Sequence, residues 1–468
     1  MASKSARIAA LAAKTLAAAA LAALLLAVLI NLHDPEISAQ ARAMARFQST
    51  AIPAETNAYI ALLGFTAPAE IDPITEGKRL AAERDITVSA DPFARERPPH
   101  EERESDPDQD DHLEFSGDLD AVCDIFGEPC MPFARARSQA VRSLFTTNLV
   151  LIDRYEQARR LPGFVAVPIA DKERADLVRS SFERVHALLL TVAALDAQEA
   201  HAAEACSSLQ ADGAFWRRVL SGASTISDKL TAFRALSEDA RLASEFVASA
   251  AFDPGACGPS LRTLLVPLTD DEVSLADAFR LAYVPTVRML ASWPDPAISV
   301  EPESWADRYL KETPIYDLFY RRNASINRCA ALYAELATLA AQPTPRFAAV
   351  RDVFLADSSD LASIGPRWIY NPLGKALLGR HLPLHVEYIA HGHGVAAYIM
   401  LVRTQLELRL AGVSLAQVPQ FLERAGPAAT NPLDGRPFHW DREHRSLSFD
   451  PLDRRWRRWG TSATIVEP

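Results

Sequence analysis

The chain has 468 residues, 49% of them hydrophobic, which is enough to bury one large core or two to three smaller ones. Its formal net charge is -11 and it has no extended basic stripe. This argues against general nucleic-acid binding, because phosphate contacts require clustered Lys and Arg. Gly is scarce, at 18 residues, and Ala and Leu dominate the middle of the chain, so the composition favours helix over sheet.

The first 34 residues predict a short cytoplasmic tip followed by a transmembrane anchor. Lys4, Arg7 and Lys14 precede an apolar run over residues 16–30. With the Ala-rich turn before it, this run approaches the roughly 20 residues needed to span a bilayer. The AQA sequence at 39–41 fits the small-x-small pattern of signal-peptide cleavage, but it lies well beyond the end of the apolar core. An uncleaved anchor is therefore favoured over a cleaved signal peptide.

The charge distribution predicts the orientation of this anchor. Cations precede the apolar run and an acidic patch follows it, so the positive-inside rule places the N-terminus in the cytoplasm. Residues 15–32 would contact the bacterial inner membrane. The later stretch AYIMLVRTQLELRL is broken by Arg403, Glu407 and Arg409, so it does not return across the bilayer. We expect a single-pass inner-membrane protein with the bulk of its chain in the periplasm.

Beyond the anchor, composition divides the chain into four regions. Residues 35–90 are typical of short helices near the membrane, and the charged, Pro-rich residues 91–118 are typical of an acidic linker or surface loop. Residues 119–426 predict a mainly α-helical periplasmic domain built from helical hairpins. Residues 427–468 predict a C-terminal turn and a small β-hairpin with a basic-aromatic tail.

Helical periodicity is clearest in three stretches of this domain. Apolar residues recur at helical spacing over residues 225–250 and again over 394–411. A long candidate helix runs from residue 172 to about 205. The predicted fold class is therefore mainly α.

The stretch TNPLDGRPFHW at 430–440 predicts a turn and not an active-site loop. Asn431 and Pro432 fit the first two positions of a type I turn. Apolar residues then alternate on either side of a charged turn at 441–445, which is typical of a β-hairpin with one buried face.

Several segments carry a resemblance to known proteins. NLHDPEISAQARA and NAYIALLGFTAPAEIDP follow the apolar anchor, and FWRRVLSGASTISDKL, YNPLGKALL and NPLDGRPFHW lie in the middle and C-terminal parts. In these patches the chain resembles a group of uncharacterised, single-pass, membrane-anchored periplasmic proteins of Gram-negative bacteria. The resemblance implies the localisation and the helical architecture. It implies no activity and supplies no site residues.

The five cysteines predict disulfides if the compartment is oxidising. Cys123 and Cys130 could close a short loop, and Cys206 and Cys257 could join the two ends of the helical pair between them. Cys329 would remain as a small buried apolar residue.

The histidines at GRHLPLHVEYIAHGHG are the weak candidates for a metal site. His385, His391 and His393 lie in this segment together with His381. Pro383 argues against a regular helix there, and the segment has no HExxH spacing. A solvated or locally hydrogen-bonded cluster is favoured over a metal site.

Other motifs fail on residue type. Asp106, Asp108 and Asp110 imitate the start of a calcium loop, but the required Gly and the bidentate Glu are missing. No nucleophile elbow of a serine hydrolase occurs. The sequence therefore predicts no catalytic residue, cofactor or metal ligand.

The tail RRWRRWG offers a surface for anionic lipid head groups. The candidate membrane-contact residues are Arg454, Arg455, Trp456, Arg457, Arg458 and Trp459. The favoured alternative is that the two tryptophans pack on the body, since the segment is too short for an interfacial element by itself.

These features predict a membrane-tethered periplasmic binding or scaffolding protein of the cell envelope, with an envelope protein as its partner. The alternative is an envelope enzyme whose site is assembled from non-contiguous residues around the His381–His393 segment. A deep polar pocket at these histidines would favour the enzyme, and an exposed apolar patch would favour the binding protein.

Overall fold

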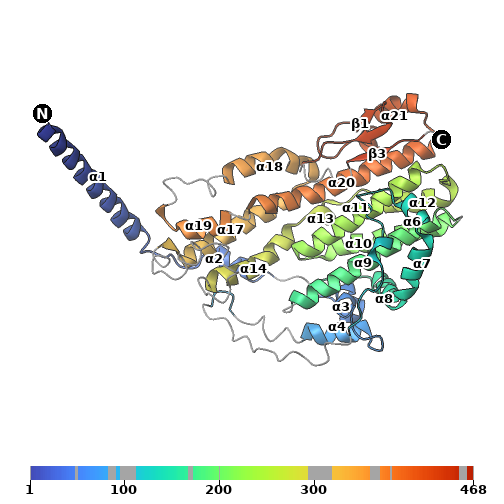
Figure 1. Cartoon of the computed structure of the whole chain (residues 1–468), viewed down its shortest axis with the longest axis horizontal. Coiled ribbons are helices and arrows are strands. Elements are labelled where there is room, and N and C mark those ends of the chain that lie inside the picture. Colours follow the sequence, from blue (N-terminus) through green and yellow to red (C-terminus); the bar gives the residue numbers. More distant parts are fainter. Residues whose placement is uncertain are drawn as a thin grey trace.

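Helices dominate the computed structural model of the chain, as the Ala- and Leu-rich composition predicts, and a small antiparallel sheet lies near the C-terminus (Figure 1). The fold class is therefore confirmed as mainly α. The structure describes residues 2–47, 51–82, 91–94, 112–166, 172–199, 201–292, 319–358, 369–379, 382–452 and 461–466.

The first helix, α1 (Ala2–Ile30), stands apart from the rest of the molecule in Figure 1. Its segment Leu11–Ile30 is 20 residues long and is apolar enough to cross a membrane. None of that segment is buried against the body. The predicted apolar helix is thus confirmed.

Short helices follow α1, as predicted for residues 35–90. They are α2 (Ala39–Ala45), the 3-10 turn η1 (Ala54–Thr56), α3 (Ala58–Leu63) and α4 (Pro73–Ala82). Helix α2 packs against α14 and α17, whereas α3 packs against α8 and α9. These helices are therefore part of the packed body.

One arginine fixes the loop between α3 and α4. Arg154, on α8 (Leu149–Arg160), is only 4% exposed. Its guanidinium donates hydrogen bonds of 2.5 to 2.9 Å to the carbonyl oxygens of Phe65, Ala67, Pro68 and Ile71. A buried arginine is stable only when its N–H groups are paired in this way.

The main body is built from long helices that run roughly along the long axis in Figure 1 and from shorter helices around them. In chain order they are α6 (Cys130–Ala136), α7 (Ser138–Thr147), α8, α9 (Lys172–Asp196), α10 (Ala202–Gly222), α11 (Ile226–Ala248), α12 (Pro254–Leu264), α13 (Asp270–Val273), α14 (Ala276–Ser292), α17 (Arg322–Ala340), α18 (Thr344–Ser358), α19 (Pro372–Gly379), α20 (Leu382–Leu410) and α21 (Val418–Ala425). Helix α11 confirms the helix predicted over 225–250.

The long helix predicted from 172 to about 205 is divided in two. Helix α9 ends at Asp196, and α10 begins at Ala202. The Gln198 side chain donates a 2.6 Å hydrogen bond to the carbonyl oxygen of Met131 on α6. This tertiary contact holds the chain in a turn, and helical periodicity alone does not reveal it.

Helix α20 is the longest helix of the body and runs through its middle. It contacts α11, α12, α17, α18 and the sheet, so most of its described side chains are buried or half-buried. The segment around Pro383 is helical, contrary to the expectation of an irregular one. Pro383 falls in the first turn of α20, where proline is tolerated because the missing N–H has no helical partner.

The NPLDG segment forms the predicted turn, but its hydrogen bonding is not that of a type I turn. The Gly435 N–H donates to the Asn431 carbonyl at 2.8 Å, one residue further along than a type I turn requires. Gly435 has a φ of 70°, a conformation that favours glycine.

The predicted hairpin forms next to this turn. Strands β1 (His439–Asp441) and β2 (Ser446–Ser448) pair antiparallel, with Trp440 opposite Leu447. Phe438, Leu447 and Phe449 are buried, which confirms one buried face. A third strand, β3 (Ser462–Thr464), pairs with β2 and packs on α20. Its Ser-Ala-Thr sequence is too short and too polar to have predicted a strand.

Both described ends of the acidic segment predicted as a linker dock on the body. The Phe93 ring packs against the core, Phe115 is buried, and the Leu113 N–H donates to the Thr66 carbonyl at 2.9 Å. The candidate calcium-loop residues of this segment, 106–110, lie outside the described residues.

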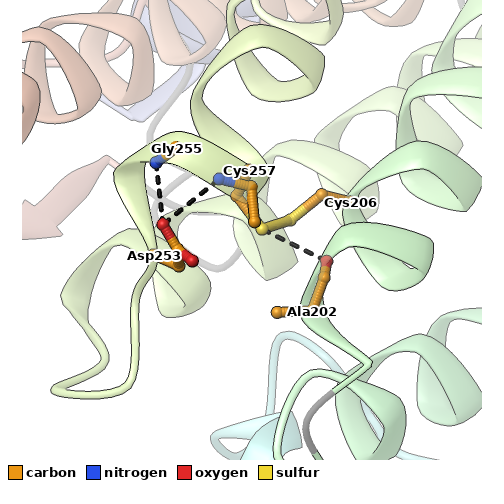
Figure 2. Close-up of a disulfide and its surroundings, with 6 residues drawn as sticks. Ala202, Cys206, Asp253, Gly255 and Cys257 are labelled. Carbon is orange, nitrogen blue, oxygen red and sulfur yellow. Dashed lines mark hydrogen bonds between the residues drawn. A yellow bond between two sulfur atoms is a disulfide. The ribbon is translucent and has the colours of Figure 1, made fainter.

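The predicted Cys206–Cys257 disulfide is present (Figure 2). It joins the first turns of α10 and α12, with the Cα atoms 5.4 Å apart. The Asp253 side chain caps α12 by accepting hydrogen bonds from the N–H groups of Gly255 and Ala256. The bridge therefore closes the two ends of the α10–α11 pair.

The other predicted bridge, Cys123–Cys130, is not formed, and both residues are buried free thiols. Separate contacts place them, because the Cys123 N–H donates to Thr191 and the Cys130 N–H donates to Glu245. A hydrogen bond with Cys123, together with burial, raises the pKa of Cys130. Sequence spacing does not determine cysteine pairing, which is why this expectation was wrong.

Removing the bridge through the double variant Cys206→Ala/Cys257→Ala should lower the free energy of unfolding by about 2–4 kcal/mol. The closed segment spans 51 residues, so the disulfide removes substantial loop entropy from the unfolded chain. Chemical denaturation of the body measures this loss. As a control, Cys123→Ala should leave the effect of a reducing agent on stability unchanged. A wild-type protein whose stability does not respond to reduction would contradict the prediction.

Candidate functional site

A cluster of ionisable side chains lies at the centre of the four helices α8 to α11. Tyr155 comes from α8, His186 from α9, Asp212 from α10 and Asp239 from α11, and each is no more than 3% exposed. Aromatic rings enclose the cluster: Phe182, Phe215 and Trp216 pack around Tyr155 and one another. The helices thus bury a polar centre inside an apolar shell.

Both ring nitrogens of His186 lie close to carboxylate oxygens of this cluster. Its Nδ1 lies 2.9 Å from Oδ2 of Asp212, and its Nε2 lies 3.2 Å from Oε2 of Glu238 on α11. The imidazole therefore lies between two carboxylates from different helices.

Asp212 is the most highly connected acid of the cluster. Its Oδ1 accepts a 2.7 Å hydrogen bond from the Tyr155 hydroxyl and lies 3.3 Å from Nη1 of Arg159. Its Oδ2 accepts a 3.2 Å hydrogen bond from Nε1 of Trp216 and also faces His186. These donors stabilise the charged carboxylate.

Asp239 differs from Asp212 in lacking donors. Both of its carboxyl oxygens are buried, and neither meets a hydrogen-bond donor among the described residues. Its neighbour is the Asp212 carboxyl group. Burial, followed by the negative charge of Asp212, raises the pKa of Asp239 well above its ordinary value.

The pKa values of His186 and Asp212 move in the directions that favour an ion pair. Burial by itself lowers the pKa of His186, but Asp212, Glu238 and Asp239 outweigh burial and raise it well above its ordinary value. Burial by itself raises the pKa of Asp212, but His186 and Arg159 outweigh it and lower that pKa. Each group therefore favours the charged form of the other, and the two side chains attract each other inside the body.

Two further ion pairs lie at the edge of the cluster. Arg234 Nε donates to Glu238 at 2.8 Å, and Arg159 Nη2 donates to Glu156 at 2.8 Å. Arg234 thus balances Glu238, whereas Arg159 is shared between Glu156 and Asp212.

A cavity of about 90 Å³ adjoins this cluster. Its wall includes Tyr59, Val178, Phe182, Trp216, Val219 and Thr231. Trp216 belongs to both features, because its ring lines the cavity while its Nε1 donates to Asp212. Asp228 and Arg179 supply charge at the wall, and burial raises the pKa of Asp228. The cavity suits a small apolar group.

The histidines singled out in the sequence do not converge on one site. His385 contacts the rings of Phe279 and Tyr333, on α14 and α17. His391 contacts the ring of Phe233 on α11. His393 turns to α18, where it stacks on Phe347 and shares a 2.9 Å hydrogen bond with Thr344.

Each of these imidazoles thus packs against a different helix of the body. His381 and the tail residues Arg454–Trp459 lie outside the described part of the chain.

The sequence contained one signal for the buried cluster. Asp239 lies three residues after Leu236 and four before Ala243, on the apolar face of α11. A carboxyl group at such a position is rarely buried without a partner. The spacing could not identify the partners, because His186 and Asp212 come from separate helices.

No protein-family model, curated protein or solved structure matches the chain.

His393 should make the protein less stable as the pH falls. Burial lowers the pKa of His393 from 6.5 to about 3, so the folded chain keeps this imidazole neutral while the unfolded chain binds a proton. Between these two values, protonation of the unfolded state costs about 1.4 kcal/mol of stability per pH unit. Above the pKa of 6.5 that the imidazole has in the unfolded chain, His393 no longer makes the stability depend on pH.

The variant His393→Leu should flatten the fall in the free energy of unfolding between pH 6 and pH 4, as measured by chemical denaturation, by about that amount per unit. Phe347→Leu, which alters the packing on the His393 ring, should lower the free energy of unfolding. It should leave the dependence of that free energy on pH unchanged. An unchanged slope in His393→Leu would show that this imidazole is not held neutral.

Proposed function

We propose that the chain is a membrane-tethered binding protein of the bacterial envelope, held in the inner membrane by α1 with its body in the periplasm. The segment that follows α1 is the main support for the tether. It is hydrogen-bonded into the body over several residues, although it precedes the predicted cleavage pattern.

Asn31 joins the end of α1 to the segment before α19. Its Oδ1 accepts a 2.7 Å hydrogen bond from the Asn371 N–H, and its Nδ2 donates to the Ile369 carbonyl at 2.5 Å. The same Nδ2 donates to the Ala27 carbonyl within α1. Asn31 is fully buried despite being polar. These contacts give the buried amide group of Asn31 its hydrogen-bond partners.

Asp34 and Ser38 join the same segment to α17. The Asp34 carboxylate accepts hydrogen bonds of 3.1 and 3.0 Å from the N–H groups of Asn323 and Ala324, at the N-terminus of α17. Anions are stabilised at this end of a helix. Asn327 on α17 accepts a hydrogen bond from the Ser38 N–H and donates one to the Glu36 carbonyl.

Cleavage at the AQA sequence of residues 39–41 would remove all of these contacts. It would also cut through α2, in which Ala41 is fully buried. Signal peptides are discarded and do not form part of the folded body. The arrangement therefore supports an uncleaved anchor.

The disulfide supports a periplasmic body. Disulfides persist in oxidising compartments such as the periplasm and are rare in the cytosol. The Cys206–Cys257 bridge lies in the body, on the C-terminal side of α1. A cytoplasmic N-terminus agrees with the three cations that precede the apolar segment.

The cavity beside Trp216 supports a binding role for the body. Its wall is largely apolar and lies at the meeting point of α3, α9, α10 and α11. An apolar side chain of an envelope protein would fill such a space and leave the enclosed polar cluster undisturbed. The alternative of an enzyme around the His381–His393 segment gains no support from the diverging positions of His385, His391 and His393.

The anchor should be retained in the mature protein. Intact-mass measurement of the chain extracted from inner membranes should show residues 2–41 still attached, because residues 31–41 are packed into the folded body. A control chain in which an established cleavable signal peptide replaces residues 1–34 should be shortened in the same cells. A mature N-terminus at residue 42 in the natural chain would contradict the tether.

A photo-crosslinking residue placed at Thr231, in the cavity wall, should capture an envelope protein in intact cells. The same residue at Val353, an exposed position on α18, serves as the control and should not capture that protein. Filling the cavity by Val219→Phe should reduce the Thr231 product by about tenfold, which corresponds to 1.4 kcal/mol of binding free energy. Equal capture at both positions, or capture unaffected by Val219→Phe, would contradict binding in the cavity.

A further inference from the structure

The buried cluster of α8 to α11 has the features of a metal site. His186, Asp212 and Asp239 each offer one ligand atom, and these atoms lie within 4.8 Å of one another. All three residues are buried, and they come from three different helices. We propose that these residues bind one divalent transition-metal ion at the centre of the helical body.

Asp239 provides an independent reason for this assignment. Its two carboxyl oxygens are buried and meet no donor in the part of the chain that the structure describes. A buried carboxyl group without a donor is unfavourable, because its lost hydration is not replaced. Coordination of an ion would satisfy both this carboxyl group and the neighbouring Asp212.

His186 has the orientation that a metal ligand requires. Its Nε2 faces Glu238 at 3.2 Å, and Arg234 holds that carboxylate from the other side at 2.8 Å. With the Glu238 carboxylate beside Nε2, the other ring nitrogen is the one placed to coordinate the metal. Nδ1 of His186 is the nitrogen that faces Asp212.

The charges of the cluster also fit a divalent ion. Glu238 is balanced by Arg234, and Arg159 is shared between Glu156 and Oδ1 of Asp212. Two ionised aspartates would then neutralise one ion of charge two. Oδ2 of Asp212, which is directed to His186 and away from Arg159, is its coordinating oxygen.

The ligand set indicates the class of metal. One imidazole and two carboxylates suit zinc, manganese or iron, whereas a calcium site is built from oxygen ligands. Tyr155 places its hydroxyl 3.2 Å from Nδ1 of His186, where it could serve as an additional oxygen ligand. Because the cluster is enclosed by aromatic rings, the ion would be acquired as the chain folds and would tie α9, α10 and α11 together.

The competing account is a purely structural proton network, in which a protonated Asp239 contributes no metal ligand. The variant Asp239→Asn separates the two accounts. Asparagine has nearly the shape of a protonated aspartate and cannot carry the negative charge that the ion needs. It should leave the metal-free protein as stable as the wild type and remove metal binding.

The test uses the full-length protein, purified in detergent from cells grown with added zinc or manganese. Elemental analysis should find about one ion per wild-type chain, and Asp239→Asn should hold at least about tenfold less. Glu272→Gln, a buried acid outside the cluster, should keep the ion. A chelator present during refolding should lower the unfolding temperature of the wild type but not that of Asp239→Asn.

Two results would overturn the proposal. One is wild-type protein without a stoichiometric ion under both growth conditions, which decides the matter even if the variant fails to fold. The other is Asp239→Asn retaining the same ion content as the wild type.

Discussion

The pairing of His186 with Asp212 is the constraint on which the centre of the body depends. A buried imidazole and a buried carboxylate are stable only where each meets a hydrogen-bonding partner, an opposite charge or a metal ion. Tyr155, Trp216 and Arg159 supply the remaining contacts of Asp212, so α8 and α10 must meet α9 at one relative position. A slip of either helix by one residue would leave a buried charge without its partner.

The packing of the helices links this polar centre to the cavity and to the segment that follows α1. Trp216 donates to Asp212 on one side and lines the cavity on the other, so the polar centre fixes the cavity wall. Helix α11 contacts α14, and α14 packs along α17, the helix that receives the Asp34 carboxylate. Figure 1 shows α1 leaving the body at the end formed by α2, α14, α17 and α19. The segment that follows α1 and the cavity beside Trp216 therefore belong to one continuously packed body.

Sequence patterns were informative where structure is local. Apolar spacing located α11, the turn residues located the C-terminal hairpin, and cysteine positions suggested the Cys206–Cys257 bridge. They failed where a distant contact decides the structure. Gln198 holds the break after α9 through Met131. The tolerance of Pro383 depended on its place within a helix whose start the pattern had not located. The candidate site was missed because its residues come from separate helices, and the conspicuous histidines near residue 390 instead pack against aromatic rings.

The central claim is that the His186–Asp212–Asp239 cluster is a metal centre as well as the polar core of the body. Anomalous diffraction at the zinc absorption edge, from crystals of protein folded with zinc, tests this claim most directly. The account predicts one strong peak within coordination distance of His186 Nδ1, Asp212 Oδ2 and an Asp239 oxygen. A map with no peak among these atoms, or with zinc only at exposed surface residues, would contradict it.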